Sequence, residues 1–314
     1  MTNALGSVLR YAVFGAFVLM VAVFVALRPD EFAQISTLRS ILDDAAVLAV
    51  AAAGLTVILA VGEFDLSFGS IAGFAGAVAV YAMVTLGIPI VPALLLAVVA
   101  ALLAGGVNGG LVAYGRVPAL IGTLAVGSVV LGLERALMDD KTVYDGIPRG
   151  FLTITESELL GLPLTVYISL VVVAAVGAFL SFTVPGRRIY ATGSGEDAAR
   201  ISGIRTKRVR MMAFAIGALC AAIAGVLLMS RGASYYPSAG VGLLLPAYSA
   251  CFLGWSAASS GRFHPVYTYF GVIFMGTMAT GLIMLQVASW VTDLVQGLVL
   301  GIAVLVARSV RRTA

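Results

Sequence analysis

Long apolar runs joined by short polar connections make up almost the whole of this chain. A helix needs about 20 apolar residues to cross the hydrocarbon core of a bilayer. Because the runs are continuous rather than alternating, they favour membrane-spanning helices over the strands of a β-barrel. The pattern predicts ten segments: residues 8–27, 45–62, 69–86, 88–107, 117–138, 163–184, 211–230, 245–256, 265–285 and 288–307.

One of these segments, residues 245–256, is too short to cross a bilayer at about 1.5 Å per residue. We expect it to be extended, broken or re-entrant. Little polar sequence remains outside the runs, so we predict a single transmembrane domain over residues 1–314. The predicted fold is an all-α polytopic membrane protein, a bundle of about ten transmembrane helices.

The composition and the absent motifs narrow the class further. Hydrophobic residues are 61% of the chain, charged residues 11%, and the mean hydropathy is +1.07, which excludes a water-soluble globular protein. The sequence contains no phosphate-binding loop, no metal-ligand spacing and no serine-nucleophile motif. We therefore expect a protein that is not an enzyme and that holds no catalytic residue, metal or cofactor.

The basic residues are distributed unequally between alternate connections. With the amino terminus inside, six of the 19 lysines and arginines fall outside: Arg28, Arg39, Arg135, Lys141, Arg149 and Arg231. The other thirteen fall inside: Arg10, Arg116, seven within residues 187–210, Arg262, Arg308, Arg311 and Arg312. This excess predicts that both termini are cytoplasmic. The net charge of +4 then reflects topology rather than binding of nucleic acid.

Residues 187–210 form the longest polar interruption, and seven of the basic residues lie there. Gly193 can break the preceding structure, and Glu196 and Asp197 suit the first turn of a helix, where the helix dipole favours negative charge. Gly203 can terminate that helix. The segment predicts a short amphipathic helix flanked by basic residues. The alternative is an ordinary cytoplasmic loop whose positive charge only fixes the topology.

Asp65 lies between a glycine and a serine in residues 62–67, which read Gly-Glu-Phe-Asp-Leu-Ser. If this turn lies at the surface, Asp65 caps the next helix, with Ser67 or Ser70 as alternatives, and this is the interpretation we favour. If the turn lies within the bundle, an unwound segment with a carboxylate would line the pathway. The candidates for a helix break or pathway are Gly62, Asp65, Ser67, Gly69 and Asn108.

Asn108 lies among glycines that let helices approach closely, so its amide can hydrogen-bond across the contact. We favour this packing role over pathway lining. Among acidic residues we place only Asp65 and Asp293 within the membrane region. Ion-coupled carriers usually need intramembrane acidic groups that bind protons or sodium, and these groups are scarce here. Active transport by this chain would therefore need an external source of energy.

Four segments carry a resemblance to a known family. Residues 54–76 (GLTVILAVGEFDLSFGSIAGFAG) resemble the signature of the ribose-type monosaccharide permeases of bacterial ABC importers. Residues 107–124 are similar to the Asn-Gly, Gly-Arg and Pro-x-x-Ile-x-Thr-Leu pattern of that family, and residues 190–208 to its cytoplasmic segment. The run 290–307 resembles its last helix.

The resemblance implies a permease of the bacterial inner membrane that works with two ATPase subunits, a periplasmic solute-binding protein and a second copy or paralogue of itself. It implies that residues 185–210 form a cytoplasmic loop that couples to the ATPase. The coupling residues it implies are Gly193, Glu196, Asp197, Ala198, Ala199, Arg200 and Gly203.

Two departures from the family pattern limit what the resemblance implies. Residues 193–195 read Gly-Ser-Gly where relatives have Gly-Gly-Asn, and residues 253–270 replace a glycine-rich run with LGWSAASSGRFHPVYTYF. The second departure affects local geometry and the substrate. The alternatives are an ABC permease for branched-chain amino acids or nucleosides and an ATP-independent secondary transporter.

Overall fold

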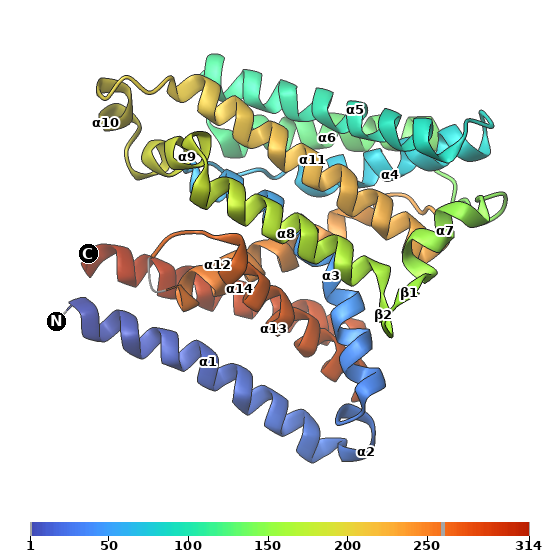
Figure 1. Cartoon of the computed structure of the whole chain (residues 1–314), viewed down its shortest axis with the longest axis horizontal. Helices are drawn as coiled ribbons and strands as arrows, with labels where there is room; N and C mark the ends of the chain where they lie inside the picture. The colour runs from blue at the N-terminus through green and yellow to red at the C-terminus, as the bar shows by residue number, and fades with distance from the viewer. Residues whose placement is uncertain (1, 259–260, 314) are drawn as a thin grey trace.

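The computed structural model describes residues 2–258 and 261–313 as a bundle of helices (Figure 1). Seven helical stretches are long and apolar enough to span a membrane, and three shorter apolar helices accompany them among the described residues. Each predicted segment coincides with one of these helices, so the all-α polytopic fold is confirmed. The helices are α1 (Thr2–Leu27), α3 (Ile35–Ala60), α4 (Phe68–Val84), α5 (Ile90–Gly109), α6 (Ala119–Met138), α8 (Leu164–Phe182), α11 (Thr206–Gly232), α12 (Leu244–Ala257), α13 (Pro265–Met284) and α14 (Ser289–Thr313).

The remaining elements are short. They are α2 (Pro29–Phe32), the π-helical turn η1 (Gly110–Tyr114), α7 (Arg149–Glu156), α9 (Val184–Ser194), α10 (Glu196–Ile201), the 3₁₀ helix η2 (Ala239–Leu243) and the antiparallel pair β1 (Glu158–Leu159) and β2 (Leu162–Pro163). Of these, η2 packs on α4 inside the bundle. We call the end with α9, α10 and both termini the α10 end, and the opposite end, with α7 and the hairpin, the α7 end (Figure 1).

Several helices extend beyond the predicted segments. Helix α3 begins at Ile35 instead of residue 45, and α11 begins at Thr206 instead of residue 211. Both additions contain charged residues that hydropathy places outside a membrane segment, but these residues form ion pairs and so remain helical. Of the three expectations for the short segment 245–256, an extended helix is the one observed, because η2 leads directly into α12.

The fold contains two inverted halves. In the first, α3 is followed by an unwound stretch, the short helix α4, and then α5 and α6. In the second, α11 is followed by a loop, η2, the short helix α12, and then α13 and α14. Helix α4 packs on α5, α6 and α11, while α12 packs on α13, α14 and α3. Because α3 and α11 run in opposite directions and pack against each other, the arrangement is that of an inverted repeat (Figure 1).

Small residues bring the central helices into backbone contact. Residues 45–60 of α3 are all buried. Where α11 crosses α4, a methyl group on Gly225 would lie 1.9 Å from the carbonyl oxygen of Ala72. Such close approach replaces the hydrophobic effect as the source of helix association in lipid. Any residue other than glycine at position 225 would therefore push α4 and α11 apart at this point.

We predict that Gly225→Ala destabilises the protein by roughly 1–3 kcal/mol, because overpacking forces the two backbones apart. The thermal unfolding midpoint in detergent measures the effect. Gly106→Ala is the matched control, since a methyl group there would meet nothing within 4 Å. Equal midpoints for both variants would contradict the tight contact.

Candidate functional site

The stretch between α3 and α4 is the polar break in the interior of the bundle. Residues 61–67 are not helical, and Gly62 has a φ of +90°, a conformation that favours glycine. Asp65 is only 2% exposed, and Ser67 is fully buried. The backbone N atoms of Val61, Gly62 and Glu63 still donate to carbonyl oxygens of α3. The buried backbone of Asp65 and Leu66 needs other partners, because lipid supplies none.

Side chains from two other helices supply those partners, and a third helix bonds to the Ser67 side chain. The Tyr248 hydroxyl of α12 accepts a hydrogen bond from the Asp65 backbone N at 2.8 Å and donates to the Asp65 carbonyl oxygen at 3.0 Å. Thr123 of α6 accepts from the backbone N of Leu66 at 3.0 Å. The Asn108 amide of α5 donates to the Ser67 hydroxyl at 2.6 Å. The break is therefore held by α5, α6 and α12 together.

The Asp65 carboxylate is directed at the start of α4. It accepts from the backbone N of Ser67 at 2.8 Å and also from the Ser67 hydroxyl. Ser67 occupies the N-cap position itself. The turn is thus buried rather than at the surface, while the carboxylate still accepts from the amino-terminal end of a helix, where negative charge is favoured. Gly69 packs on Gly240, since a methyl group on it would lie 2.8 Å from the Gly240 carbonyl oxygen.

Asn108 lies in the close contact that its glycine neighbours allow. A methyl group on Gly105 would lie 3.0 Å from the carbonyl oxygen of Phe214 in α11. The amide nitrogen of Asn108 bonds across to the break, and its Oδ1 is buried without a hydrogen-bond partner among the described residues. The residue therefore contributes to packing between α5 and the break and carries one unused acceptor.

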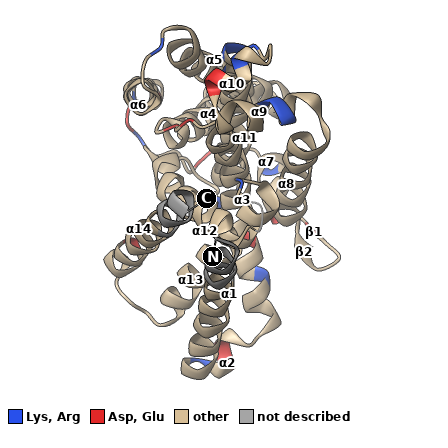
Figure 2. Cartoon of the chain, turned by 90° about the vertical axis from the view of Figure 1, so that its left-hand side faces the viewer, with Lys and Arg blue, Asp and Glu red and all other residues tan. Residues whose placement is uncertain are grey.

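The second candidate region is the surface at the α10 end. A cavity of about 850 Å³ lies there between the end of α5, α10 and the start of α11. Figure 2 looks onto this end and shows lysines and arginines beside α9 and α10, with acidic residues on α10. The basic residues that line the cavity are Arg116, Arg200, Arg205, Lys207, Arg208 and Arg210.

Helix α10 has the predicted start and end. Glu196 and Asp197 occupy its first turn, and Arg200 bonds to Asp197 at 2.9 Å. The chain leaves the helix at Gly203, which has a φ of +81°. Ala199 is buried against the bundle, whereas Ala198 is exposed and Ile201 is 86% exposed. Ile201 is an apolar side chain in a polar loop, and the sequence analysis did not single it out.

Arg210 connects the α10 surface to the break. Its guanidinium forms ion pairs with Glu63, in the unwound stretch, and with Glu196 of α10, the latter at 3.4 Å. Thr206 also donates to Glu196 at 3.1 Å. Burial raises the pKa of the Glu63 carboxyl above its usual value, and the charge and hydrogen bond of Arg210 oppose that rise.

Gly193 provides a second contact between the loop and α3. A methyl group on Gly193 would lie 2.1 Å from the carbonyl oxygen of Ala60, the last residue of α3. The backbone just before α10 therefore touches the end of the helix that leads into the break. The surface and the break are joined by a backbone contact as well as by ion pairs.

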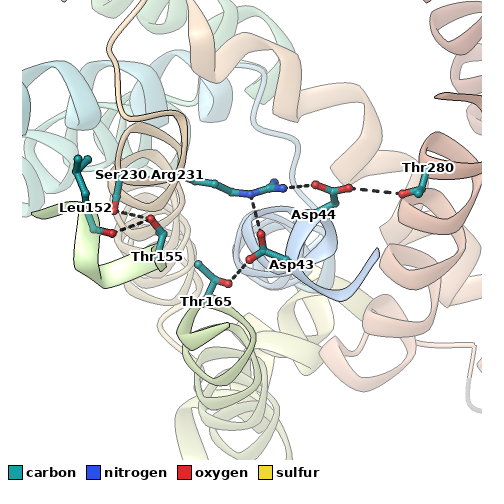
Figure 3. Close-up of polar contacts among 8 residues, drawn as sticks. All are labelled: Asp43, Asp44, Leu152, Thr155, Thr165, Ser230, Arg231 and Thr280. Atoms are coloured by element: carbon teal, nitrogen blue, oxygen red, sulfur yellow. Dashed lines mark hydrogen bonds and ion pairs between the residues drawn. The ribbon is translucent and has the colours of Figure 1, made fainter. Parts of the chain in front are cut away.

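A third polar cluster joins α3 and α11 at the α7 end (Figure 3). Arg231 of α11 lies between Asp43 and Asp44 of α3. Its Nε is 3.1 Å from Asp43 Oδ2, and its Nη2 pairs with Asp44 Oδ1. Thr165 of α8 donates to Asp43, and Thr280 of α13 donates to Asp44 at 3.5 Å. Four helices meet at this cluster.

The expectation that Asp65 and Asp293 are the only acidic residues in the membrane region was wrong. Asp43 and Asp44 lie inside α3, and Glu134 is fully buried in α6, where it accepts from the Tyr235 hydroxyl at 3.1 Å and from the Ser238 backbone N at 2.9 Å. Glu134 lies within a predicted segment and could have been found from the sequence. Asp293 lies exposed in α14.

Fold and site define a polytopic all-α membrane protein with a polar helix break in its interior. The chain belongs to the family described as "Branched-chain amino acid transport system / permease component", whose profile matches residues 37–304. Members of this family are permease subunits of transporters.

Curated relatives cover nearly the whole chain. The ribose import permease protein RbsC of Bacillus subtilis is 34% identical over 94% of this chain and 91% of its own length. RbsC of Haemophilus influenzae is 30% identical over 93% of this chain and 91% of its own length. The autoinducer 2 import system permease protein LsrC of Shigella flexneri is 31% identical over 88% of this chain and 80% of its own length. The predicted resemblance to the ribose-type permeases is confirmed.

We predict that Tyr248→Phe destabilises the protein by about 1–3 kcal/mol, because it leaves the buried backbone N and O of Asp65 without partners. Tyr144→Phe is the control, since Tyr144 is 70% exposed. Thermal unfolding in detergent compares the two. A midpoint for Tyr248→Phe equal to that of the control would show that the break does not depend on this hydroxyl.

Proposed function

We propose that this chain is the membrane-spanning subunit of an ATP-driven importer for a monosaccharide or a related small polar solute. The observation that carries the proposal is α10, which presents Ile201 outward and packs Ala199 inward at a basic end of the bundle. An exposed apolar side chain on a short helix suits docking in a cleft of a partner. That partner is an ATPase subunit.

The α10 end then faces the cytoplasm of a bacterial cell, and both termini lie there. The distribution of basic residues supports this orientation. The loop 185–210 is the coupling loop, with Gly193, Glu196, Asp197, Ala198, Ala199, Arg200 and Gly203 as its coupling residues. A second copy or a paralogue completes the pathway, and a solute-binding protein delivers the substrate at the α7 end.

The proposed mechanism runs from α10 to the break. Closure of the ATPase subunits pushes α10, and Gly193 and Arg210 pass the displacement to the end of α3 and to Glu63. The break, with Gly62, Asp65 and Ser67, is the hinge between α3 and α4, because the backbone of Asp65 and Leu66 is held by side chains rather than by helical hydrogen bonds. Gly69 of α4 and Asn108 of α5 adjoin it in the neighbouring helices. This movement opens the pathway alternately toward each side of the membrane.

The names of the relatives favour a sugar or sugar-like substrate over an amino acid. Ribose and autoinducer 2 are the solutes named for RbsC and LsrC. The family description names branched-chain amino acids, which remain the alternative class. Uptake of labelled ribose and labelled leucine into vesicles that contain the permease, its ATPase and its binding protein would distinguish the two.

We predict that Ile201→Asp abolishes copurification with a coexpressed partner ATPase, because a charge replaces the apolar group that enters the cleft. Leu160→Asp is the matched control, since Leu160 is 92% exposed on the hairpin at the opposite end. If the ATPase is retained by both variants, α10 is not the docking element. If the wild-type chain binds no ATPase, the secondary-transporter alternative gains support.

We predict that Glu63→Gln leaves ATPase binding unchanged but lowers transport by about tenfold, the effect of losing roughly 1.4 kcal/mol of coupling. The substitution keeps the shape of the side chain and removes its ion pair with Arg210, while Arg210 retains Glu196. Substrate uptake and ATP hydrolysis are measured on the same vesicles. Glu31→Gln, which removes an exposed ion pair at the other end, is the control. Normal uptake by Glu63→Gln would exclude this route of coupling.

A further inference from the structure

A second cavity, separate from the α10 surface, lies where α8 and α9 meet the segment that leads into α13. Its volume is about 540 Å³. Arg187 and Tyr190 of α9 line one side, and Arg262 and His264 line the other. The segment 253–270 departs from the family pattern, and Arg262 and His264 belong to it. Neither the break nor the α10 surface uses these residues.

The side chains that line this cavity carry positive charge without negative charge. Arg187 and Arg262 are both present, and no acidic residue is among the lining side chains. Within the described ranges, no ion pair involves either arginine. The guanidinium of Arg262 lies over the Tyr190 ring, 5.7 Å from its centroid, which orients it. Two arginines in one cavity suit an anion, and the planar guanidinium matches phosphate oxygens.

The frame of the cavity is fixed by hydrogen bonds. His264 Nε2 and the Ser181 hydroxyl are 2.8 Å apart, and the Tyr190 hydroxyl donates to the Phe263 carbonyl oxygen at 2.8 Å. His264 Nδ1 also accepts from the backbone N of Val266 at 3.3 Å. Partial burial lowers the pKa of His264, so its ring is neutral near pH 7 and the arginines supply the charge.

The surface around the cavity is apolar and exposed. Phe182, at the end of α8, is 81% exposed, and Val184 and Val266 are also exposed. In a membrane protein such side chains contact acyl chains. The cavity thus lies where apolar surface gives way to arginines and tyrosines, the composition of a membrane interface. Basic pockets between helices at this level bind lipid headgroups.

We propose that this cavity binds the phosphate of an anionic phospholipid headgroup. Arg187 and Arg262 bind the phosphate, and the acyl chains lie along Phe182, Val184 and Val266. A soluble phosphate compound would share the headgroup chemistry but could not use the apolar rim. The site is independent of the importer function proposed above.

The test is native mass spectrometry of the intact chain released from detergent containing phosphatidylglycerol or phosphatidylcholine. The wild type should retain phosphatidylglycerol in preference to phosphatidylcholine. The double variant Arg187→Gln, Arg262→Gln should reduce that retention at least about fivefold, a loss of roughly 1 kcal/mol. The charge-matched control is Arg188→Gln with Arg208→Gln, two exposed arginines of the same end that lie outside the cavity. An equal loss in both double variants, or none in either, would overturn the proposal.

Two further measurements separate the remaining outcomes. Arg187→Lys with Arg262→Lys keeps the charge and should restore part of the lipid retention, which a variant that merely misfolds would not do. Inorganic phosphate at millimolar concentration should not displace the lipid, because it lacks acyl chains. Displacement by phosphate alone would show that the ligand is a soluble phosphate compound and would overturn the lipid assignment.

Discussion

The absence of hydrogen-bond partners in lipid is the constraint on which this structure depends. A helix satisfies its own backbone, so an unwound stretch inside the bundle must borrow donors and acceptors from its neighbours. Residues 65–67 borrow them from Tyr248 of α12, Thr123 of α6 and the Asp65 carboxylate, and Asn108 of α5 donates to the Ser67 side chain. Three helices are consequently tied to one point. A movement of any of them changes the environment of the break, and the backbone of the break cannot move without them.

Helix α11 packs against α3 and has an ion-paired arginine near each of its ends. Near one terminus Arg231 pairs with Asp43 and Asp44 of α3, and near the other Arg210 pairs with Glu63, in the stretch that follows α3. Between these points small residues such as Gly217 of α11 and Gly54 of α3 make the contact. The Arg210–Glu63 pair, whose side chains are 19% and 12% exposed, resists separation, because removing one partner leaves a poorly solvated charge. The helix pair α3 and α11 is thus a rigid axis about which the inverted halves are arranged.

Hydropathy and helix-end signals predicted the spans, the fold class and the start and end of α10. They did not predict that α3 extends back to Ile35, because Asp43 and Asp44 are costly in lipid until Arg231 is placed beside them. Arg231 is 188 positions away from Asp43 in the sequence, and no local pattern announces that pairing. Ile201 was missed for a similar reason, since only the packing of Ala199 decides which face of α10 is free. The partners of Asp65 come from helices whose register a single sequence does not fix.

The ion pairs at the α7 end affect how a membrane potential acts on the folded chain. Four of the six basic residues on that side are paired with carboxylates: Arg28, Arg135, Lys141 and Arg231. With the α10 end inside, these segments are the ones carried across the bilayer during synthesis. Each uncompensated charge moved across a membrane potential of 100 mV changes the free energy by about 2.3 kcal/mol. In the folded protein the paired charges cancel, so the membrane potential acts on fewer charges at the α7 end than the count of basic residues indicates.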